Sequence, residues 1–191
     1  MPKQITSPRQ IAVYASVAGL FLMARPQLPT FLTGCGLALA GIAIRVWGCG
    51  HLRKNQEMIS SGPFAHVQHP LYLGTFFVAT GALLAAGAPE MPALLLWVAV
   101  WPLVTATFFF YYLPKKRRIE GGRLERAFGE QFTEWKSSVP VFVPRVTPYR
   151  NATQRKWNWQ VFRGNHELEM DLLIVGMFAA IFLLSPGSMG G

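Results

Sequence analysis

The sequence predicts an all-α protein: a polytopic membrane helical bundle of about five transmembrane helices, with a cytoplasmic amphipathic helix that closes a polar pocket. Three observations predict this fold class. Hydrophobic residues make up 51% of the 191 residues, most of them lie in long uncharged runs, and the basic residues cluster beside these runs. Such basic clusters are typical of cytoplasmic loops that face anionic lipid. The net charge of +9 therefore favours a membrane protein, and we expect no nucleic-acid partner.

Five apolar runs are the candidate membrane spans. The first, residues 11–24, is only about 21 Å long as a helix, short of a hydrocarbon core of about 30 Å. It could be the core of a signal peptide, but residues 25–29 make a poor cleavage site, so we prefer a short first membrane helix. The other runs cover residues 31–50, 71–88, 91–113 and 172–184.

The positions of the charges predict the orientation of these spans. Basic residues crowd residues 1–10, 51–68 and 115–163, whereas the turn at Pro89 and the C-terminal tail have none. The positive-inside rule then gives a multi-pass protein with a cytoplasmic N terminus and an outside C terminus. We expect any active site to face the cytoplasm, because the polar connections lie on that side. Arg25 is the one charge that disagrees. If the marginal last run is only re-entrant, the chain has four spans and its C terminus lies inside.

These patterns divide the chain into three parts. Residues 1–50 form an N-terminal transmembrane hairpin, residues 51–145 a central catalytic region, and residues 146–191 an interfacial segment followed by a membrane helix. In the central region, residues 120–137 predict an amphipathic helix, because apolar side chains recur there on one face of a 3.6-residue period. Those side chains are Leu124, Phe128, Phe132 and Trp135.

The cysteines do not indicate a metal site or a disulfide. Cys35 and Cys49 lie in one apolar run and would be roughly 21 Å apart on a helix, too far to pair with each other. No CxxC or Cys/His spacing of the kind that binds zinc occurs, so we expect no metal.

Polar side chains gather where the third apolar run begins, in the stretch from Ser61 to Gly74. We expect this stretch and the amphipathic helix to close a polar pocket over the ends of the spans. The candidate lining residues are Asn55, Gln56, His66, Gln68, His69, Tyr72, Arg118 and Glu120. Simpler roles exist for each, such as anchoring at the interface or a solvated helix start. Arg45, near the end of the second run, either snorkels to the interface or forms a cationic wall of the pocket.

Two sequence blocks resemble the isoprenylcysteine carboxyl methyltransferase and phospholipid methyltransferase superfamily. The first is Gly62-Pro63-Phe64 through Gln68-His69-Pro70-Leu71-Tyr72-Leu73-Gly74, a G-P-x-x-x-x-Q-H-P-x-Y-x-G motif. The second is Arg118-Ile119-Glu120-Gly121, followed by Leu124, Phe128-Gly129, Phe132, Trp135 and Val139-Pro140. Two positions depart from the family pattern: Gln68 stands for an arginine and Gly121 for a glutamate. Losing the charged, bidentate guanidinium makes a carboxyl substrate doubtful.

The resemblance implies a membrane methyltransferase that uses S-adenosylmethionine and acts on a lipid-like or isoprenylcysteine-type acceptor, with a membrane lipid or membrane-partitioned small molecule as its partner. Glu120 would hold a polar end of the cofactor, and Gln68 with Arg45 would orient the substrate. The implied catalytic residues are Gln68, His69, Tyr72 and Arg45. The implied cofactor-binding residues are Gly62, Pro63, His69, Pro70, Tyr72, Leu73, Gly74, Arg118 and Glu120.

Two alternatives remain open from the sequence. One is an NADPH-dependent membrane reductase of related architecture, in which the basic run from Lys115 to Arg118 would hold the 2′-phosphate. The other is a non-catalytic lipid-binding or scaffold protein, which the departures at Gln68 and Gly121 favour. The sequence does not predict the oligomeric state.

Overall fold

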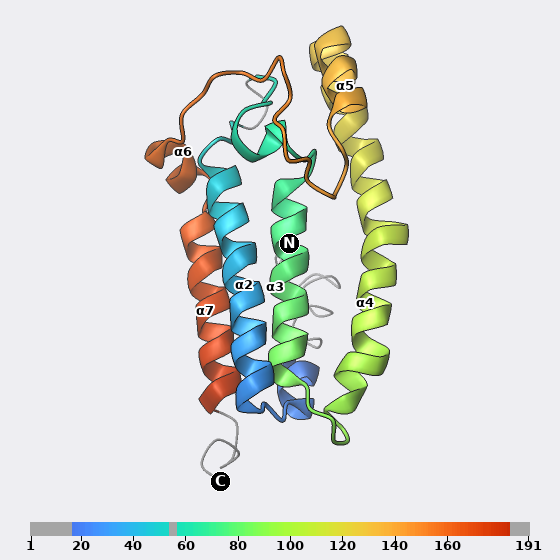
Figure 1. Ribbon diagram of the computed structural model, residues 1–191, viewed down its shortest axis with the longest axis vertical. Coiled ribbons are helices and arrows are strands. Elements are labelled where there is room, and N and C mark those ends of the chain that lie inside the picture. Colours follow the sequence, from blue (N-terminus) through green and yellow to red (C-terminus); the bar gives the residue numbers. More distant parts are fainter. Residues whose placement is uncertain (1–16, 54–56, 184–191) are drawn as a thin grey trace, which may run out of the picture.

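The computed structural model describes residues 17–53 and 57–183, and within these ranges the regular structure is entirely helical (Figure 1). A first helical stretch covers residues 17–23. The named elements are α2 (Leu28–Cys49), η1 (Gly62–Ala65), α3 (Pro70–Ala86), η2 (Leu96–Val100), α4 (Trp101–Thr107), η3 (Phe108–Tyr112), α5 (Leu113–Ser138), α6 (Trp159–Gly164) and α7 (Glu167–Leu183). The predicted all-α class is confirmed.

Two helices of the described chain are long and apolar enough to cross a membrane. One is α2, with 22 residues, and the other is the continuous helical run Leu96–Ser138, with 43 residues. Helices α3 and α7 are apolar but have only 17 residues each, fewer than the roughly 20 that span a bilayer upright. The predicted span at residues 11–24 lies partly outside the described residues. Five transmembrane helices are therefore a finer expectation than the structure shows.

Glycines set the distance between α2 and α3, which lie side by side in the centre of the molecule (Figure 1). A Cβ atom added at Gly34 would lie 2.4 Å from the carbonyl oxygen of Gly81, and one added at Gly41 would lie 2.6 Å from that of Gly74. The reverse pairs are equally close. Each contact therefore brings a backbone against a backbone, which only glycine allows, as at small-residue interfaces of membrane helices.

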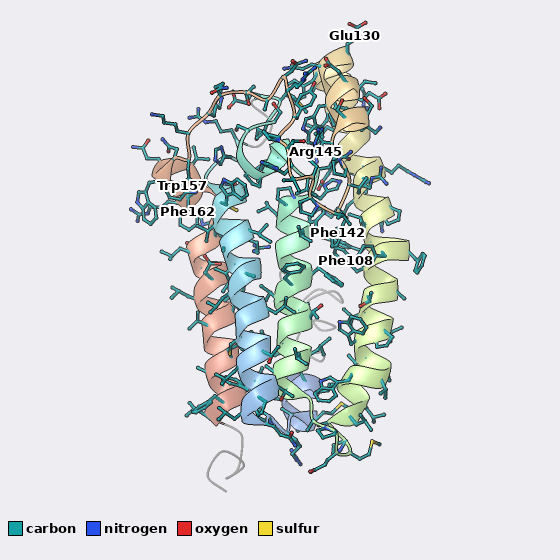
Figure 2. The ribbon with its side chains drawn as sticks, viewed as in Figure 1. Phe108, Glu130, Phe142, Arg145, Trp157 and Phe162 are labelled. Carbon is teal, nitrogen blue, oxygen red and sulfur yellow. The ribbon has the colours of Figure 1, made fainter. Side chains whose placement is uncertain are left out.

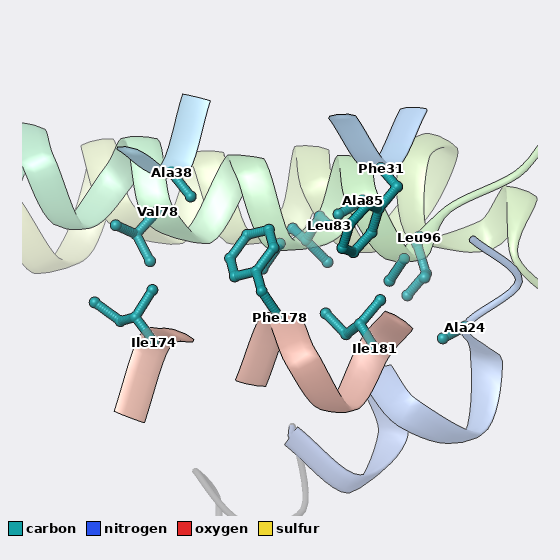
Figure 3. Close-up of a cluster of buried hydrophobic side chains, with 12 residues drawn as sticks. Ala24, Phe31, Ala38, Val78, Leu83, Ala85, Leu96, Ile174, Phe178 and Ile181 are labelled. Atoms are coloured by element: carbon teal, nitrogen blue, oxygen red, sulfur yellow. The ribbon is translucent and has the colours of Figure 1, made fainter. Parts of the chain in front are cut away.

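An apolar core joins α2, α3 and α7 at the end of the bundle remote from the polar loops (Figure 3). Phe178 and Ile181 of α7 face Phe31 of α2, with the Phe31 and Phe178 ring centroids 6.4 Å apart. Leu96, at the start of η2, is 1% exposed and packs in the same core, so a fourth segment of the chain contributes to it. The core holds the three helices as a scaffold for the opposite, polar end.

The predicted amphipathic helix is not one continuous helix, which corrects the expectation for residues 120–137. Gly129 has φ +50° and ψ −124°, a conformation that a side chain would oppose. The chain reverses at Gly129. Residues on either side of it therefore meet: Lys136 Nζ lies 3.9 Å from Glu125 Oε2, and the Phe132 ring approaches Gly121. The apolar residues on both sides of Gly129 still meet, since Leu124 and Phe128 pack against the cluster that contains Phe132 and Trp135.

The polar end of the bundle is covered by the loop before α3, the second half of α5 and the segment that follows it. Trp135 Nε1 donates to the carbonyl oxygen of Phe64 at 2.9 Å. The amides of Tyr149 and Arg145 donate to the carbonyl oxygens of Ala65 and His66. These bonds satisfy buried backbone groups and hold the three segments together as one cap.

Candidate functional site

A cavity of about 670 Å³ lies beneath this cap, between the start of α3 and the first half of α5. It is about as large as the pockets that bind small organic molecules. Its polar lining comes from the loop before α3, from α3 itself and from both halves of α5. The polar and charged lining residues are Arg53, Glu57, Gln68, His69, Tyr72, Arg117, Arg118, Glu120, Arg123 and Lys136.

The carboxylate of Glu120 is fixed inside this cavity. The hydroxyl of Tyr72 donates to Glu120 Oε1 at 2.6 Å, and Lys116 Nζ lies 3.7 Å from the same oxygen. His69 stacks on Tyr72 with ring centroids 5.2 Å apart, and the ring of Tyr112 meets Tyr72 edge-on at 5.7 Å. The second oxygen of Glu120 has no part in the Tyr72 bond, so this group could accept a hydrogen bond from a ligand.

His69 is an uncharged imidazole near neutral pH. The pKa of His69 is lowered to about 4, mainly by burial; the Glu120 carboxylate opposes this shift and the Arg117 guanidinium adds to it. Desolvation dominates because the charged imidazolium would lose its hydration beneath the cap. A neutral ring can both donate and accept a hydrogen bond, so His69 offers the cavity a polar contact without charge.

The lining carries more positive than negative charge. Five Arg or Lys residues and two glutamates contribute to it. Apolar surface faces these charges, mainly from Phe64, Leu124, Phe132 and Trp135. The arrangement suits a molecule with an anionic group for the guanidinium groups, a donor for Glu120 and an apolar or aromatic part.

Gln68 lines the cavity, but its side chain is already committed to the protein. Its amide nitrogen donates to the carbonyl oxygens of Lys136 and Val139, at 2.8 and 2.6 Å, and its backbone amide donates to Pro140. A carboxamide satisfies both buried acceptors at the end of α5 without a charge. Gln68 therefore links the loop before α3 to the end of α5 through hydrogen bonds.

Four other motif residues lie in the framework beside the cavity, and none of them is among its lining residues. Gly62 has φ +57°, and a Cβ there would lie 2.5 Å from the His51 ring. Gly74 faces Gly41 and the side chain of Arg45. Pro63 and Leu73 are buried next to these glycines. Pro70, by contrast, is buried and does line the cavity.

Arg45 is directed away from the cavity and holds α7 to the bundle. Its Nε and Nη2 atoms donate to the two carboxylate oxygens of Glu167 at 2.6 and 2.9 Å, and its Nη1 donates to Thr75 at 2.6 Å. Glu167 is 3% exposed and also accepts from the Cys49 thiol at 3.2 Å. This bidentate pair satisfies a buried charge. A substrate-orienting role for Arg45 would require it to leave that partner.

The remaining sequence candidates divide between the cavity and the cap. Arg118 lines the cavity, whereas the His66 ring bonds to the carbonyl oxygen of Arg145 at 2.9 Å in the cap. Asn55 and Gln56 lie outside the described residues. The predicted lining did not include Arg53, Glu57, Arg117, Arg123 and Lys136, which line the cavity. The dense basic run before Glu120 was a signal for Arg117, but the reversal at Gly129 brings Lys136 in.

Taken together, the fold and site define an all-helical protein with membrane-length apolar helices and a cationic, partly aromatic cavity at its polar end. No protein-family model matches the chain. The chain is 33% identical over 120 residues to the cobalt-zinc-cadmium resistance protein CzcN of Cupriavidus metallidurans, an alignment covering 62% of this chain and 50% of that protein. It is 27% identical over 120 residues to the nickel-cobalt-cadmium resistance protein NccN of Alcaligenes xylosoxydans xylosoxydans, covering 62% and 51%. No solved structure matches.

These comparisons correct the functional interpretation of the sequence. The relatives carry the names of metal-resistance proteins. The predicted membership of the isoprenylcysteine carboxyl methyltransferase superfamily was therefore wrong, and so was the predicted methyltransferase activity. The NADPH-dependent reductase and the non-catalytic lipid-binding protein do not match these names either. Residues of the two motif blocks line the cavity and pack the α2–α3 pair and the cap, but the blocks misled as a guide to activity. The chain spans about half the length of these curated relatives.

Proposed function

We propose that this chain is a membrane-embedded component of a resistance system for divalent transition-metal ions, and that its cavity binds a small organic molecule that this system uses. The observation that carries the proposal is the 33% identity to the cobalt-zinc-cadmium resistance protein over 120 residues. The second relative, named for nickel, cobalt and cadmium, supports the same class of ions.

The charge of the cavity favours an organic ligand over a bare metal dication. Five Arg or Lys side chains against two glutamates repel a free dication but attract a carboxylate or phosphate. Glu120, held by Tyr72, offers an acceptor for an amino or ammonium group of the same ligand. S-adenosylmethionine, the cofactor predicted from the sequence, remains a prediction for this cavity. Calorimetric titration of the purified protein tests its binding without assuming any reaction.

The membrane arrangement belongs to the same proposal. The distribution of basic residues supports a multi-pass chain of about five spans with the cavity on the cytoplasmic side. The polar end of the bundle, where the cavity lies, carries most of the described cations, and the opposite end has few. Tagging each terminus and testing its accessibility from either side of the membrane would establish this orientation.

Growth in the presence of metals tests the function. Deleting the gene should lower the inhibitory concentration of at least one of cobalt, zinc, cadmium and nickel, and the wild-type chain should restore it. Glu120→Gln should restore it poorly. Glu130→Gln should restore it fully, because it makes the same chemical change at an exposed position just beyond the turn at Gly129 (Figure 2).

Two results would separate the parts of the proposal. Unchanged tolerance of the deletion strain to all four metals would overturn the role in resistance. A clear metal-sensitive phenotype that Glu120→Gln rescues as well as wild type would leave the role in resistance standing and would remove the cavity from it.

A further inference from the structure

Three aromatic side chains form a compact cluster on the outer surface of the cap, beside the ends of α2 and α7 (Figure 2). The rings of Trp157, Trp159 and Phe162 lie within 5.9 Å of one another, centroid to centroid. Phe162 is 3% exposed, whereas Trp157 is 38% and Trp159 is 53% exposed. Two indoles therefore face outward from a buried base.

Hydrogen bonds hold this cluster at the level where the apolar helix α2 ends. Trp157 Nε1 donates to the carbonyl oxygen of Val46 at 3.0 Å, and the indole lies against Gly50, where a Cβ would come within 1.9 Å of it. Asn165 Nδ2 donates to the carbonyl oxygens of Cys49 and Leu52. Because α2 is of membrane-crossing length, its last turn marks the boundary between hydrocarbon and headgroups, where tryptophan is favoured.

The segment that carries the cluster is basic, and Glu169 on the following helix is near enough to Arg163 to interact with it electrostatically. Residues 139–166 contain five Arg or Lys residues and no Asp or Glu. Arg155 is paired with Glu57, whereas no carboxylate of the described residues lies within ion-pair distance of Lys156 or Arg163, both of which are exposed. Lys156 precedes Trp157, and Arg163 follows Phe162. The two exposed cations thus flank the cluster in the sequence, in the segment that packs against the end of α2.

We propose that Lys156, Arg163 and the two indoles form a binding site for the headgroup of an anionic phospholipid. The cations attract the phosphate and any further negative charge of the headgroup, while the indoles lie among the glycerol and upper acyl groups. The occupant is a lipid because the site adjoins the apolar end of α2 and because its aromatic face is exposed. This proposal is independent of the one about metal resistance.

Native mass spectrometry of the full chain, purified in detergent, tests the site with phosphatidylglycerol and phosphatidylcholine of identical acyl chains. The wild type should bind phosphatidylglycerol more tightly. Lys156→Gln/Arg163→Gln should weaken the binding of phosphatidylglycerol about five-fold for each cation removed. The binding of phosphatidylcholine should weaken less, because its choline cation cancels the charge of its phosphate. The control Lys115→Gln/Arg126→Gln removes the same charge from exposed positions of α5 and should keep the preference.

Three results would overturn the proposal. One is equal binding of the two lipids by the wild type. Another is an unchanged lipid preference in the Lys156→Gln/Arg163→Gln variant, provided that this variant unfolds at the wild-type temperature. The third is an equal loss in the α5 control, which would indicate a response to net charge alone. Trp159→Ala gives a further readout, since it should weaken both lipids without removing the preference between them.

Discussion

The close approach of α2 and α3 rests on glycine pairs, and Gly41→Ala tests it directly. The added methyl group would lie 2.6 Å from the Gly74 carbonyl oxygen and 3.0 Å from Phe77 Cβ and Val78 Cγ2. Ordinary contacts begin at 3.4 Å, so the helices must move apart locally by about 0.8 Å. A backbone oxygen cannot rotate out of the way as a long side chain can, so the whole helix interface must adjust.

Overpacking of this kind costs about 1–3 kcal/mol in well-packed interiors. For a chain of 191 residues, each kcal/mol lowers the unfolding temperature by about 2–4 °C, so Gly41→Ala should unfold about 2–12 °C below wild type. The matched control is Gly36→Ala on the same helix, where no atom lies within 4 Å of the added Cβ. Alanine gains about 0.5–1 kcal/mol over glycine inside a helix, so this control should unfold at or above the wild-type temperature.

Tryptophan fluorescence during heating in one detergent, at one fixed scan rate, measures both variants, and the chain has 6 Trp as reporters. A second check uses Gly81→Ala, which meets the Gly34 carbonyl oxygen at 2.5 Å in the same interface. Combining it with Gly41→Ala should cost less than the sum of the two, because the first substitution already separates the helices. The reasoning is refuted if Gly41→Ala unfolds at or above the temperature of Gly36→Ala.

Three further predictions concern polar groups. Gln68→Glu should destabilise the protein by about 2–4 kcal/mol, because it replaces two donated hydrogen bonds with a carboxylate facing two carbonyl oxygens. Gln68→Met removes the polar group without adding a charge and should cost less. The opposite order of the two unfolding temperatures would exclude this account. Arg45→Met should destabilise the protein by about 3–5 kcal/mol, because it leaves Glu167 buried and unpaired. The double variant Arg45→Met/Glu167→Met should recover much of that stability. A double variant no more stable than the single one would contradict a paired buried charge. His69 has its folded pKa lowered to about 4, so its contribution to stability is complete above pH 6.5 and falls as the pH decreases from 6.5 to about 4, where the unfolded chain binds a proton and the folded chain does not. His69→Gln should reduce the drop in unfolding temperature across that window relative to wild type, and parallel pH profiles for the two proteins would show that His69 is not buried as described.

The sequence predicted much of the helical framework. The apolar runs at residues 31–50 and 71–88 correspond closely to α2 and α3, because their length, composition and flanking prolines are local properties. The run at 91–113 was also found, but its helix begins at Leu96 and continues into α5. The amphipathic pattern of residues 120–137 identified side chains that do cluster. It missed the reversal at Gly129, because the same apolar period fits one helix or two helices packed together.

The cavity was predicted in part. Gln68, His69, Pro70, Tyr72, Arg118 and Glu120 all line it, as the two sequence blocks indicated, although their roles remain predictions. Glycines and prolines in the same blocks gave no means of separating lining from framework, since close helix packing and close ligand approach both favour small residues. The resemblance of these blocks to a methyltransferase family misled the assignment of activity, because residues that build a cap do not by themselves define a reaction.

The sequence by itself determined the all-helical class, the apolar segments, and the concentration of cations at one end of the chain's helices. Only the tertiary structure decided which polar groups meet. Tyr72 and Glu120 are 48 residues apart, and Arg45 and Glu167 are 122 residues apart. The physical reason is that a side chain's local pattern fixes only the face of the helix on which it lies. Its partner depends on how whole helices pack, here through the α2–α3 glycine pairs and the turn at Gly129.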